Sequence, residues 1–476
     1  MQKTVLLLVV VLLGSVGPLL AGEEIAVGGR EQQAVSVTIY TKNLALVKDR
    51  RTIDLPKGVR TLAFREVSAQ IRPETAVMQG RDLAVLEQNF EYDLLTPQSL
   101  LRKYVGREVT MSRRHPATGE DLSVQARVLS AGDGVVLQVG NRIETEVSGR
   151  LVYPDVPDTL RDRPTLTMLV DSGAEGPREV ELTYLTAGLS WRADYVAELN
   201  AADDRLDLSG WVTLTNESGA RYPQARLQLV AGDVNVVQRS PEPRATRLEA
   251  TLAMAPAAKA MAEEPMFEYH LYSLERPTTI GENQKKQVAL LQAGGVACRK
   301  EYLLRGQEYY FSARAGEIGR KMNVGVFVEL KNEKEGGLGQ PLPGGVVRVY
   351  KKDSGGFLQF VGEDAIDHTP EKELVRLRLG DAFDITADKV QTDFKQLKRE
   401  EGEPAGSLCE SEYAIRVKNA KKEAVTVKVQ EPIPGDWQIL SESGRHVKEA
   451  ANLASWMVTV PPMETATLTY RVRVRN

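Results

Sequence analysis

Histidine and cysteine are scarce in this chain, whose 476 residues include four His and two Cys. Catalytic triads need a His base beside a nucleophile and an acid, and zinc sites need clustered His and Cys. None of the four His lies in such a motif, and we expect each at the surface or in a turn: His115, His270, His368 and His446. The sequence therefore predicts no catalytic residue, no metal ligand and no cofactor.

Other patterns that could carry chemistry are incomplete. Ser190 follows Gly188 and Leu189 as in half of a nucleophile elbow, but the second glycine is missing. Glu363 and Asp364 are adjacent, yet such pairs are unavoidable among 65 acidic residues. Two groups of aspartates are crowded but lack the Gly and terminal Glu of an EF-hand, and we interpret them as solvated turns: Asp203, Asp204 and Asp207, and Asp381, Asp384 and Asp388.

The chain also lacks a strong charge of either sign. Its formal net charge is −4, from 61 basic and 65 acidic residues, and no basic patch of the kind that binds nucleic acid is visible. The two cysteines, Cys298 and Cys409, could pair in an oxidising compartment, where so long a loop would stabilise by about 4–5 kcal/mol. They could equally be buried free thiols, because sequence does not place them close in space.

Long apolar runs are absent except at the N-terminus. Lys3 precedes an apolar run over Val5–Leu13, and Gly and Pro interrupt it before Ala21 and Gly22. A membrane-spanning helix needs about 20 apolar residues, so we interpret residues 1–22 as a secretory signal cleaved at Ala21 or Gly22. An uncleaved anchor is the alternative. The prediction is a periplasmic or secreted protein with no transmembrane helix in the mature chain.

Period-2 alternation dominates the remaining sequence and predicts strands with one apolar face. In the last such segment Leu468, Tyr470, Val472 and Val474 alternate with polar residues. One dry face and one wet face are typical of antiparallel sandwiches or open barrels. We therefore predict an all-β, multi-domain fold of antiparallel β-sandwiches.

Turn spacing divides the chain into four regions after the signal. Residues 34–95 form an N-terminal β region whose strands include Val35–Tyr40 and Ala45–Ile53. Residues 96–157 form a short helix followed by a small SH3-like barrel. The helix is expected over Thr96–Tyr104, with Thr96 as cap and Pro97 in the first turn. Residues 158–400 form a central β domain, interrupted by a flexible linker over 240–266 in which a short helix over Thr251–Met261 is conceivable. Residues 405–476 form an immunoglobulin-like sandwich.

Aromatic residues make up 6% of the chain, including four Trp. Exposed Trp could stack on sugars, but each Trp lies within or beside an apolar strand, so we expect core packing for all four: Trp191, Trp211, Trp437 and Trp456. A shift in the alternation at Gly210 indicates a bulge. Asn216-Glu217-Ser218 is a glycosylation sequon, which a β-turn before Gly219 explains without a sugar.

Residues 184–238 resemble a bacterial family called domain of unknown function 4139. The resemblance rests on Tyr184-Leu-Thr-Ala-Gly-Leu-Ser-Trp-Arg-Ala-Asp-Tyr195, on Leu208-Ser-Gly-Trp-Val-Thr-Leu-Thr-Asn-Glu-Ser-Gly219 and on Ala225-Arg-Leu-Gln-Leu-Val-Ala-Gly-Asp233. It extends over roughly residues 160–476, and residues 40–70 are similar to the family's usual N-terminal partner region. Mucoidy inhibitor A proteins carry a related domain, with a long coiled coil that has no counterpart here.

The resemblance implies an exported β-rich protein and supplies no catalytic residues. Its pattern residues are interpreted as structural: Trp191, Tyr195, Trp211, Asn216 and Gly219. The predicted function is non-catalytic binding or scaffolding in the bacterial cell envelope, with an envelope protein or polysaccharide as partner and no nucleic acid. The alternatives are a carbohydrate-binding or carbohydrate-active periplasmic protein, and an outer-membrane-associated β-protein.

Overall fold

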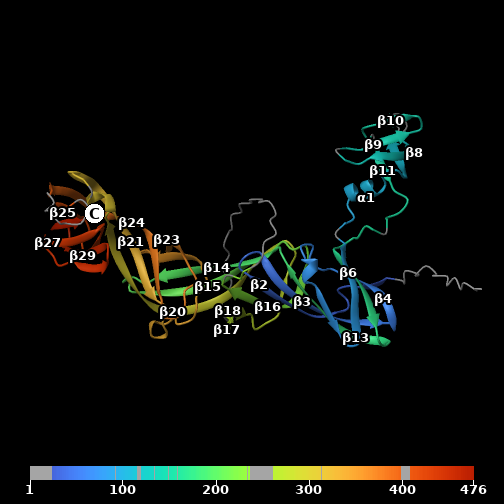
Figure 1. Ribbon diagram of the computed structural model, residues 1–476, viewed down its shortest axis with the longest axis horizontal. Helices are drawn as coiled ribbons and strands as arrows, with labels where there is room; N and C mark the ends of the chain where they lie inside the picture. The colour runs from blue at the N-terminus through green and yellow to red at the C-terminus, as the bar shows by residue number, and fades with distance from the viewer. Residues whose placement is uncertain are drawn as a thin grey trace, which may run out of the picture.

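A computed structural model describes residues 24–475 except 92, 115–118, 133, 148, 158, 233, 236–260, 312 and 398–407. The described residues form thirty strands, one α-helix and three 3-10 helices, η1 (Pro73–Thr75), η2 (Glu308–Phe311) and η3 (Lys334–Gly336). The predicted all-β, sandwich-like fold class is therefore confirmed. Figure 1 shows an elongated body, with a small sheet standing away from it at one end.

Two sheets build one end of the body. The eight-stranded sheet runs in the order β17 (Ala262–Met266), β18 (Tyr269–Ser273), β16 (Tyr222–Ala231), β2 (Gln32–Tyr40), β3 (Leu44–Leu55), β13 (Gly176–Thr186) and β5 (Val77–Gly80), with β19 (Thr278–Ile280) beside β16. The four-stranded sheet runs in the order β1 (Ile25–Val27), β4 (Gly58–Arg65), β12 (Thr165–Ser172) and β6 (Leu83–Glu91).

A thirteen-stranded sheet forms the rest of the body. Its path is β23 (Leu358–Ile366), β22 (Gly345–Lys352), β14 (Leu189–Leu199), β15 (Arg205–Asn216), β20 (Gln284–Arg305), β21 (Glu317–Lys331), β24 (Leu374–Gln396), β25 (Leu408–Asn419), β30 (Thr465–Arg475) and β27 (Asp436–Glu442). Off this path lie β26 (Val425–Pro432), β28 (Val447–Ala450) and β29 (Leu453–Val460).

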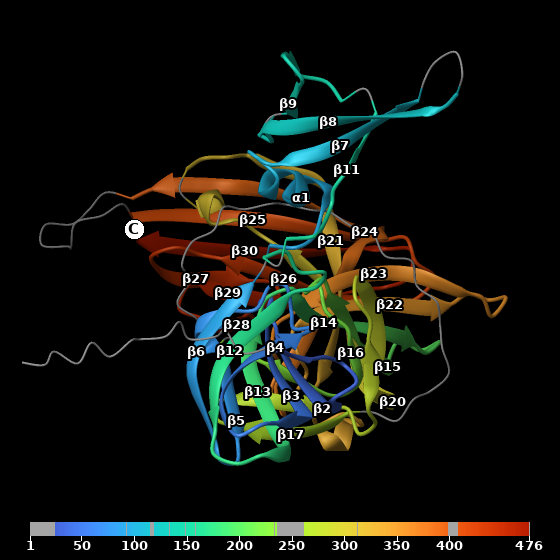
Figure 2. The same cartoon turned by 90° about the vertical axis from the view of Figure 1, so that its right-hand side faces the viewer.

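The small sheet is an insert with its own core. Its order is β10 (Arg142–Glu144), β9 (Val136–Val139), β8 (Asp121–Ser130), β7 (Glu108–Arg114) and β11 (Arg150–Val152), preceded by α1 (Pro97–Lys103). The predicted helix is confirmed: Thr96 accepts a hydrogen bond from the Ser99 amide and Pro97 opens the helix. In Figure 2 strands β7, β8 and β9 of the insert lie at the top of the view.

The described residues form three hydrophobic cores, one of which lies within the insert predicted over 96–157. The first core joins β2, β3 and β13 to β14, β15 and β20, so the N-terminal region is not separate from the central one. The second core packs residues of β25, β26, β27, β29 and β30 against Tyr302, Phe311 and Ile385. The C-terminal segment is therefore not a self-contained sandwich, because strands from the central region complete its interior.

Two details of the predicted layout need correction. The last residues of the expected linker, Ala262–Met266, form strand β17 because they pair with β18, whereas residues 240–260, including nearly all of the conceivable helix, lie outside the described part. The sheets are also not purely antiparallel. Four pairs are parallel, namely β1–β4, β14–β22, β2–β16 and β20–β26, because strands far apart in sequence meet in the same sheet.

Candidate functional site

The family-pattern residues on β14 are packing residues. Trp191 and Tyr195 are four residues apart on one face of the strand and are buried in the first core. The Tyr195 hydroxyl donates a hydrogen bond to the Pro343 carbonyl over 2.8 Å. The Trp191 indole N–H is buried and has no acceptor among the described residues. The pattern therefore secures β14 against its neighbours rather than presenting aromatic rings to a ligand.

The bulge predicted at Gly210 is present, since the register between β15 and β20 shifts at Gly210 and Trp211. A Cβ at position 210 would lie 2.8 Å from Leu291 Cγ and 3.2 Å from the Tyr195 ring. Only glycine leaves room there. The prediction of core packing for Trp211 was wrong, because this side chain is half-buried on the face of β15 opposite to that of the buried residues Leu208 and Val212.

Asn216 and Gly219 form the turn after β15. The Asn216 amide donates to the Ala220 and Gly281 carbonyls, both at 2.8 Å, and its oxygen accepts from the Ser218 hydroxyl at 2.7 Å. Gly219 has φ +76°, and a Cβ there would lie 2.7 Å from Ala69 Cβ. Because Asn216 is fully buried, the sequon is occupied by this network and is closed to a glycan in the folded protein.

This turn connects the N-terminal region to the rest of the chain. The Ala69 amide and the Ser68 hydroxyl both donate to the Ser218 carbonyl, at 2.8 Å and 3.0 Å. The most recognisable sequence in the protein therefore lies where two distant segments meet. Its chemistry is that of a buried polar turn, which requires every donor and acceptor to be matched.

The other sequence candidates remain scattered. His270 contacts Glu263 on β17, His446 lies between Trp437 and Trp456, and His368 accepts from the Gly344 amide. His115 lies outside the described residues. Ser190 is the second residue of β14. Trp437 and Trp456 are buried in the second core, as predicted. Cys298 and Cys409 are not paired with each other, so of the two alternatives for the cysteines the structure has free thiols.

Five of the six crowded aspartates form hydrogen bonds or ion pairs through their carboxylates. Asp203 forms ion pairs with Lys300 and Lys351. The interpretation of Asp203 as part of a solvated turn therefore holds only in part, because its carboxylate is paired with these two cations. The second group was placed wrongly, because Asp381, Asp384 and Asp388 lie within strand β24 rather than in a turn. Among the described residues, no group of three His, Cys, Asp or Glu side chains is arranged to hold a metal ion.

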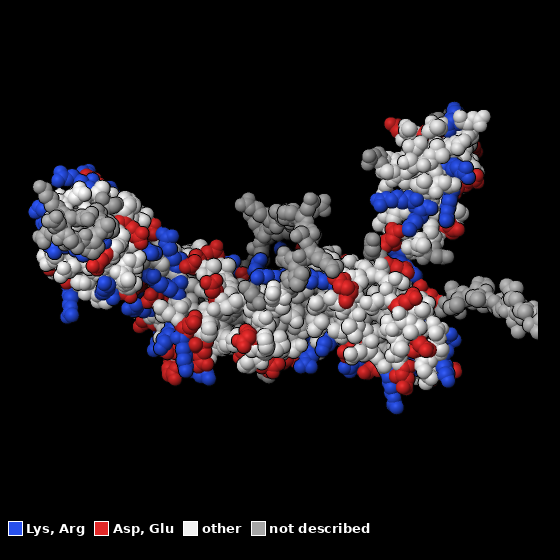
Figure 3. Space-filling model, in the orientation of Figure 1, with Lys and Arg blue, Asp and Glu red and all other residues white. Residues whose placement is uncertain are grey.

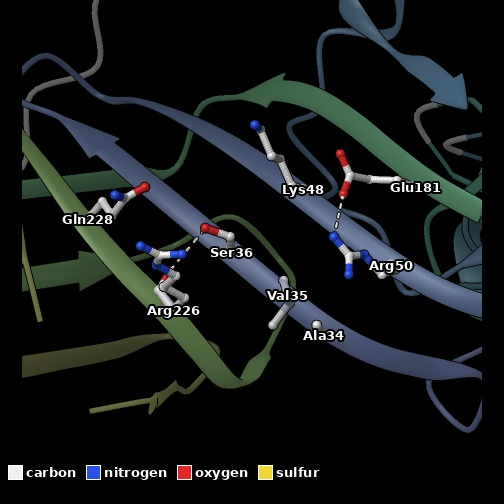
Figure 4. Close-up of a pocket in the computed structure, with 8 residues that line it drawn as sticks. All are labelled: Ala34, Val35, Ser36, Lys48, Arg50, Glu181, Arg226 and Gln228. Carbon is white, nitrogen blue, oxygen red and sulfur yellow. Dashed lines mark hydrogen bonds and ion pairs between the residues drawn. The ribbon is translucent and has the colours of Figure 1, made fainter. Parts of the chain in front are cut away.

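A basic groove lies on the outward face of the eight-stranded sheet (Figure 4). It has a volume of about 380 Å³ and is lined by Ala34, Val35, Ser36, Lys48, Arg50, Glu181, Arg226 and Gln228. Three of these side chains are basic and one is acidic, so the formal charge of the lining is 3 − 1 = +2. A second hollow of about 300 Å³ adjoins it and shares Arg226.

Strand register sets the spacing of the cations in this groove. Arg226 on β16 faces Ser36 on β2, and Ser36 faces Lys48 on β3, so the three residues form one row across the sheet. Strands are about 4.8 Å apart, which separates the backbones at the two ends of the row by about 10 Å. Arg50 lies two residues along β3 and is paired with Glu181 at 3.3 Å.

The cations at the ends of the row are not neutralised within the described part of the chain. Arg50 contacts two glutamates, Glu179 at 3.5 Å and Glu181 at 3.3 Å. Lys48 and Arg226 are exposed and have no carboxylate partner there. Figure 4 shows the Lys48 side chain pointing away from the Arg50–Glu181 pair. This arrangement suits an anion that spans neighbouring strands, because both ends of the row offer positive charge.

Sequence reasoning missed this groove for a topological reason. Alternation along Val35–Tyr40 and Ala45–Ile53 places Ser36 and Lys48 on the polar face of their strands. It does not show that β16, about 190 residues further along the chain, supplies Arg226 to the same face. Only the parallel pairing of β2 with β16 completes the row.

A second unusual arrangement lies inside the second core. The Lys389 ammonium is 2.6 Å from the Glu431 carboxylate, and each side chain is 1% exposed. Burial lowers the pKa of Lys389 and raises the pKa of Glu431 from their ordinary values. Burying an ion costs several kcal/mol. A desolvated cation–π contact contributes about 2 kcal/mol. The attraction of Lys389 to Glu431 and to the nearby rings therefore offsets only part of the cost of burial.

A comparison with models of protein families assigns the chain to a family. The model described as "Domain of unknown function (DUF4139)" matches residues 180–476, from within β13 to the end of the chain. No curated protein matches the sequence. Within the described residues, no helix is long and apolar enough to cross a membrane. Since the match covers more than half of the chain, the protein belongs to the DUF4139 family.

Proposed function

We propose that this protein is an exported, non-catalytic binding protein of the bacterial cell envelope, and that the basic groove contacts an anionic envelope polysaccharide. The row Arg226–Ser36–Lys48 is the observation that carries the proposal. Its two cations project from β16 and β3, which flank β2 in the same sheet, so the spacing of their backbone positions is fixed before a ligand arrives. A preformed site loses little conformational entropy on binding.

The chemistry of the groove favours a polymer of acidic sugars. The Ser36 hydroxyl lies between the cations, and the Gln228 amide lies two residues along β16 from Arg226. Both groups can hydrogen-bond sugar hydroxyls. The adjoining hollow extends the surface beyond Arg226, which suits a chain rather than a single small anion. Acidic and basic residues are interspersed over the face in Figure 3, so attraction is expected to be local to the groove.

The binding test compares polygalacturonate, a carboxylated polysaccharide, with dextran, a neutral one. We expect the mature chain to bind polygalacturonate in isothermal titration calorimetry, to ignore dextran, and to bind more weakly as salt screens the charges. The double variant Lys48→Glu and Arg226→Glu should weaken binding at least tenfold. Lys57→Glu, an exposed cation in the turn between β3 and β4, is the matched control. Equal weakening by both variants would contradict the assignment.

Export is tested separately. The N-terminal pattern, with Lys3 before an apolar run and small residues at Ala21 and Gly22, supports a cleaved signal. A fusion of residues 1–40 to alkaline phosphatase should show phosphatase activity when it is expressed in a bacterium. The substitution Leu8→Arg in the apolar run should abolish that activity. N-terminal sequencing of the exported protein locates the cleavage. An inactive fusion would show that the protein is not exported, and the basic groove could then not meet an envelope polysaccharide.

A further inference from the structure

The Lys389–Glu431 pair joins two layers of the second core. Lys389 lies on β24, which pairs with β21 and β25, whereas Glu431 lies on β26, which pairs with β20 and β29. Their side chains meet across the interior at 2.6 Å. Any bond between them would connect these layers directly and would close the chain between β24 and β26.

Aromatic rings enclose the Lys389 amine on several sides. Its Nζ lies 4.4 Å from the centre of the Tyr310 ring and 4.8 Å from that of Tyr413, with Phe311 and Tyr470 at 5.5 Å and 5.9 Å. Tyr470 in turn stacks on Trp456, with ring centres 4.7 Å apart. These rings exclude bulk water from the reacting atoms, which disfavours hydrolysis of a product formed there.

Backbone packing fixes the carboxyl group in place. A Cβ at Gly306 would lie 2.2 Å from Glu431 Oε2, so this glycine lets the carboxyl sit directly against the chain. Lys389 Nζ has only one other hydrogen-bond partner within the described residues, the Tyr470 hydroxyl at 3.4 Å. The amine and the carboxyl are thus held together with little freedom, the condition under which intramolecular reactions have high effective molarity.

We propose that Lys389 and Glu431 form an intramolecular amide crosslink. The lone pair of the neutral Lys389 amine attacks Cδ of the Glu431 carboxylic acid, and the new C–N bond replaces one C–O bond. The departing oxygen keeps its proton, takes a second from Nζ and leaves as one molecule of water. No oxidant, reductant or added reagent is required. The Tyr470 hydroxyl, which contacts both groups, can carry the proton from nitrogen to oxygen.

The protonation states favoured by burial are those that the reaction needs. An amine is nucleophilic only without its proton, and a carboxyl group loses water only from the protonated form. Burial lowers the pKa of Lys389 and raises that of Glu431, so proton transfer from Lys389 to Glu431 generates both reactive forms. The 2.6 Å contact is the geometry before this step.

A neighbouring pair provides a control for simple proximity. Asp388, the residue before Lys389, pairs with Lys418 on β25 at 2.5 Å, but the Lys418 side chain is 47% exposed. Water stabilises both charges there and would compete as a nucleophile. The two pairs have similar distances, but Lys418 and Asp388 are 47% and 19% exposed whereas Lys389 and Glu431 are each 1% exposed, so only the enclosed pair is expected to react.

The test is intact-mass spectrometry of the purified full chain under denaturing conditions. The wild-type mass should be lower than its sequence mass by one water, and a digest should contain a branched peptide that joins the segments around Lys389 and Glu431. Lys389→Met and Glu431→Leu should each have the mass of their sequence. Lys418→Met should still lack one water.

The wild-type result decides the proposal even if a core variant does not fold. A wild-type mass equal to the sequence mass, with separate Lys389 and Glu431 peptides, would show an ordinary buried ion pair and overturn the proposal. A loss of water mapped to another position would overturn it as well. Neither outcome bears on the basic groove, because polysaccharide binding is measured independently.

Discussion

Arg51 is a fully buried cation whose guanidinium group contacts a carboxylate, a backbone carbonyl and an aromatic ring. Its guanidinium contacts Asp49 at 2.7 Å, donates to the Val27 carbonyl at 2.8 Å and lies 3.9 Å above the Phe64 ring. Asp49 also accepts from Gln32 at 3.0 Å. These contacts connect β1, β3 and β4 at the place where the two N-terminal sheets meet.

Removing Arg51 should therefore be costly. Arg51→Met leaves Asp49 buried without its cation, and we expect a loss of about 3–5 kcal/mol in the free energy of unfolding. Arg50→Met is the matched control, because Arg50 is adjacent but exposed and its pairs should contribute less than about 1 kcal/mol. Urea denaturation of both variants measures the difference. Similar losses would show that burial does not determine the effect.

Asp194 should make stability sensitive to acid. Burial alone would raise the pKa of this carboxyl, but hydrogen bonds from Thr213, Arg348 and Arg192 outweigh it and lower the pKa below its ordinary value. The unfolded chain therefore binds the proton first as pH falls, so the contribution of Asp194 is present above about pH 4 and is lost as pH drops through the folded pKa.

The matching variant is Asp194→Asn. We expect it to be less stable than wild type at pH 7, because the amide cannot pair with two arginines. The difference between the urea midpoints of wild type and variant should become smaller as the pH falls from 5 to 2.5. This range includes the ordinary Asp pKa of about 3.9, at which the carboxyl group of the unfolded chain takes up its proton. A gap independent of pH would contradict the proposed role of the carboxylate.

At the scale of elements, glycines decide where strands approach closely. A Cβ at Gly345 would lie 2.3 Å from the Ala193 carbonyl oxygen, which belongs to the parallel partner strand β14. The obstacle is backbone and cannot rotate away. The β14–β22 pairing, which joins the family-pattern strand to the hairpin of β22 and β23, thus depends on the missing side chain.

Gly345→Ala should separate these strands and destabilise the protein by about 1–3 kcal/mol, the usual cost of overpacking. Gly444→Ala is the control, since a Cβ there meets nothing within 4 Å and should change stability by less than about 0.5 kcal/mol. Thermal unfolding followed by circular dichroism tests both. A stable Gly345→Ala variant would show that the strands can shift apart without cost.

At the scale of the whole molecule, the insert is independent and the N-terminal region is not. The insert has its own core, built around Tyr104, Met111 and Val128. At its base an isolated bridge pairs Leu94 with Arg161. By contrast, β2 and β3 are interior strands of the eight-stranded sheet, and β2 pairs with β16.

Excision of residues 96–157, with a short Gly-Ser bridge in their place, should leave a folded body. We expect one cooperative thermal transition and a Tm within a few degrees of wild type. Deletion of residues 34–65 should instead prevent folding, because it removes interior strands and part of the first core. If both deletions fail to fold, the insert supports the body in a way that its separate core does not indicate.

Sequence patterns determined the local features of this protein. Alternation gave the strands Val35–Tyr40 and Ala45–Ile53 within a few residues of β2 and β3, and Thr96 with Pro97 located the one described α-helix. The resemblance over residues 184–238 identified the family. All of these signals depend on neighbours along the chain, where propensity, capping and strand periodicity act.

Tertiary structure alone decided how the strands are combined. The parallel pairs, the shared second core, the basic row and the Lys389–Glu431 contact all join residues far apart in sequence. A strand with one apolar face can pair equally well with many partners. The choice among partners is made by packing over the whole sheet, and no short stretch of sequence contains that information.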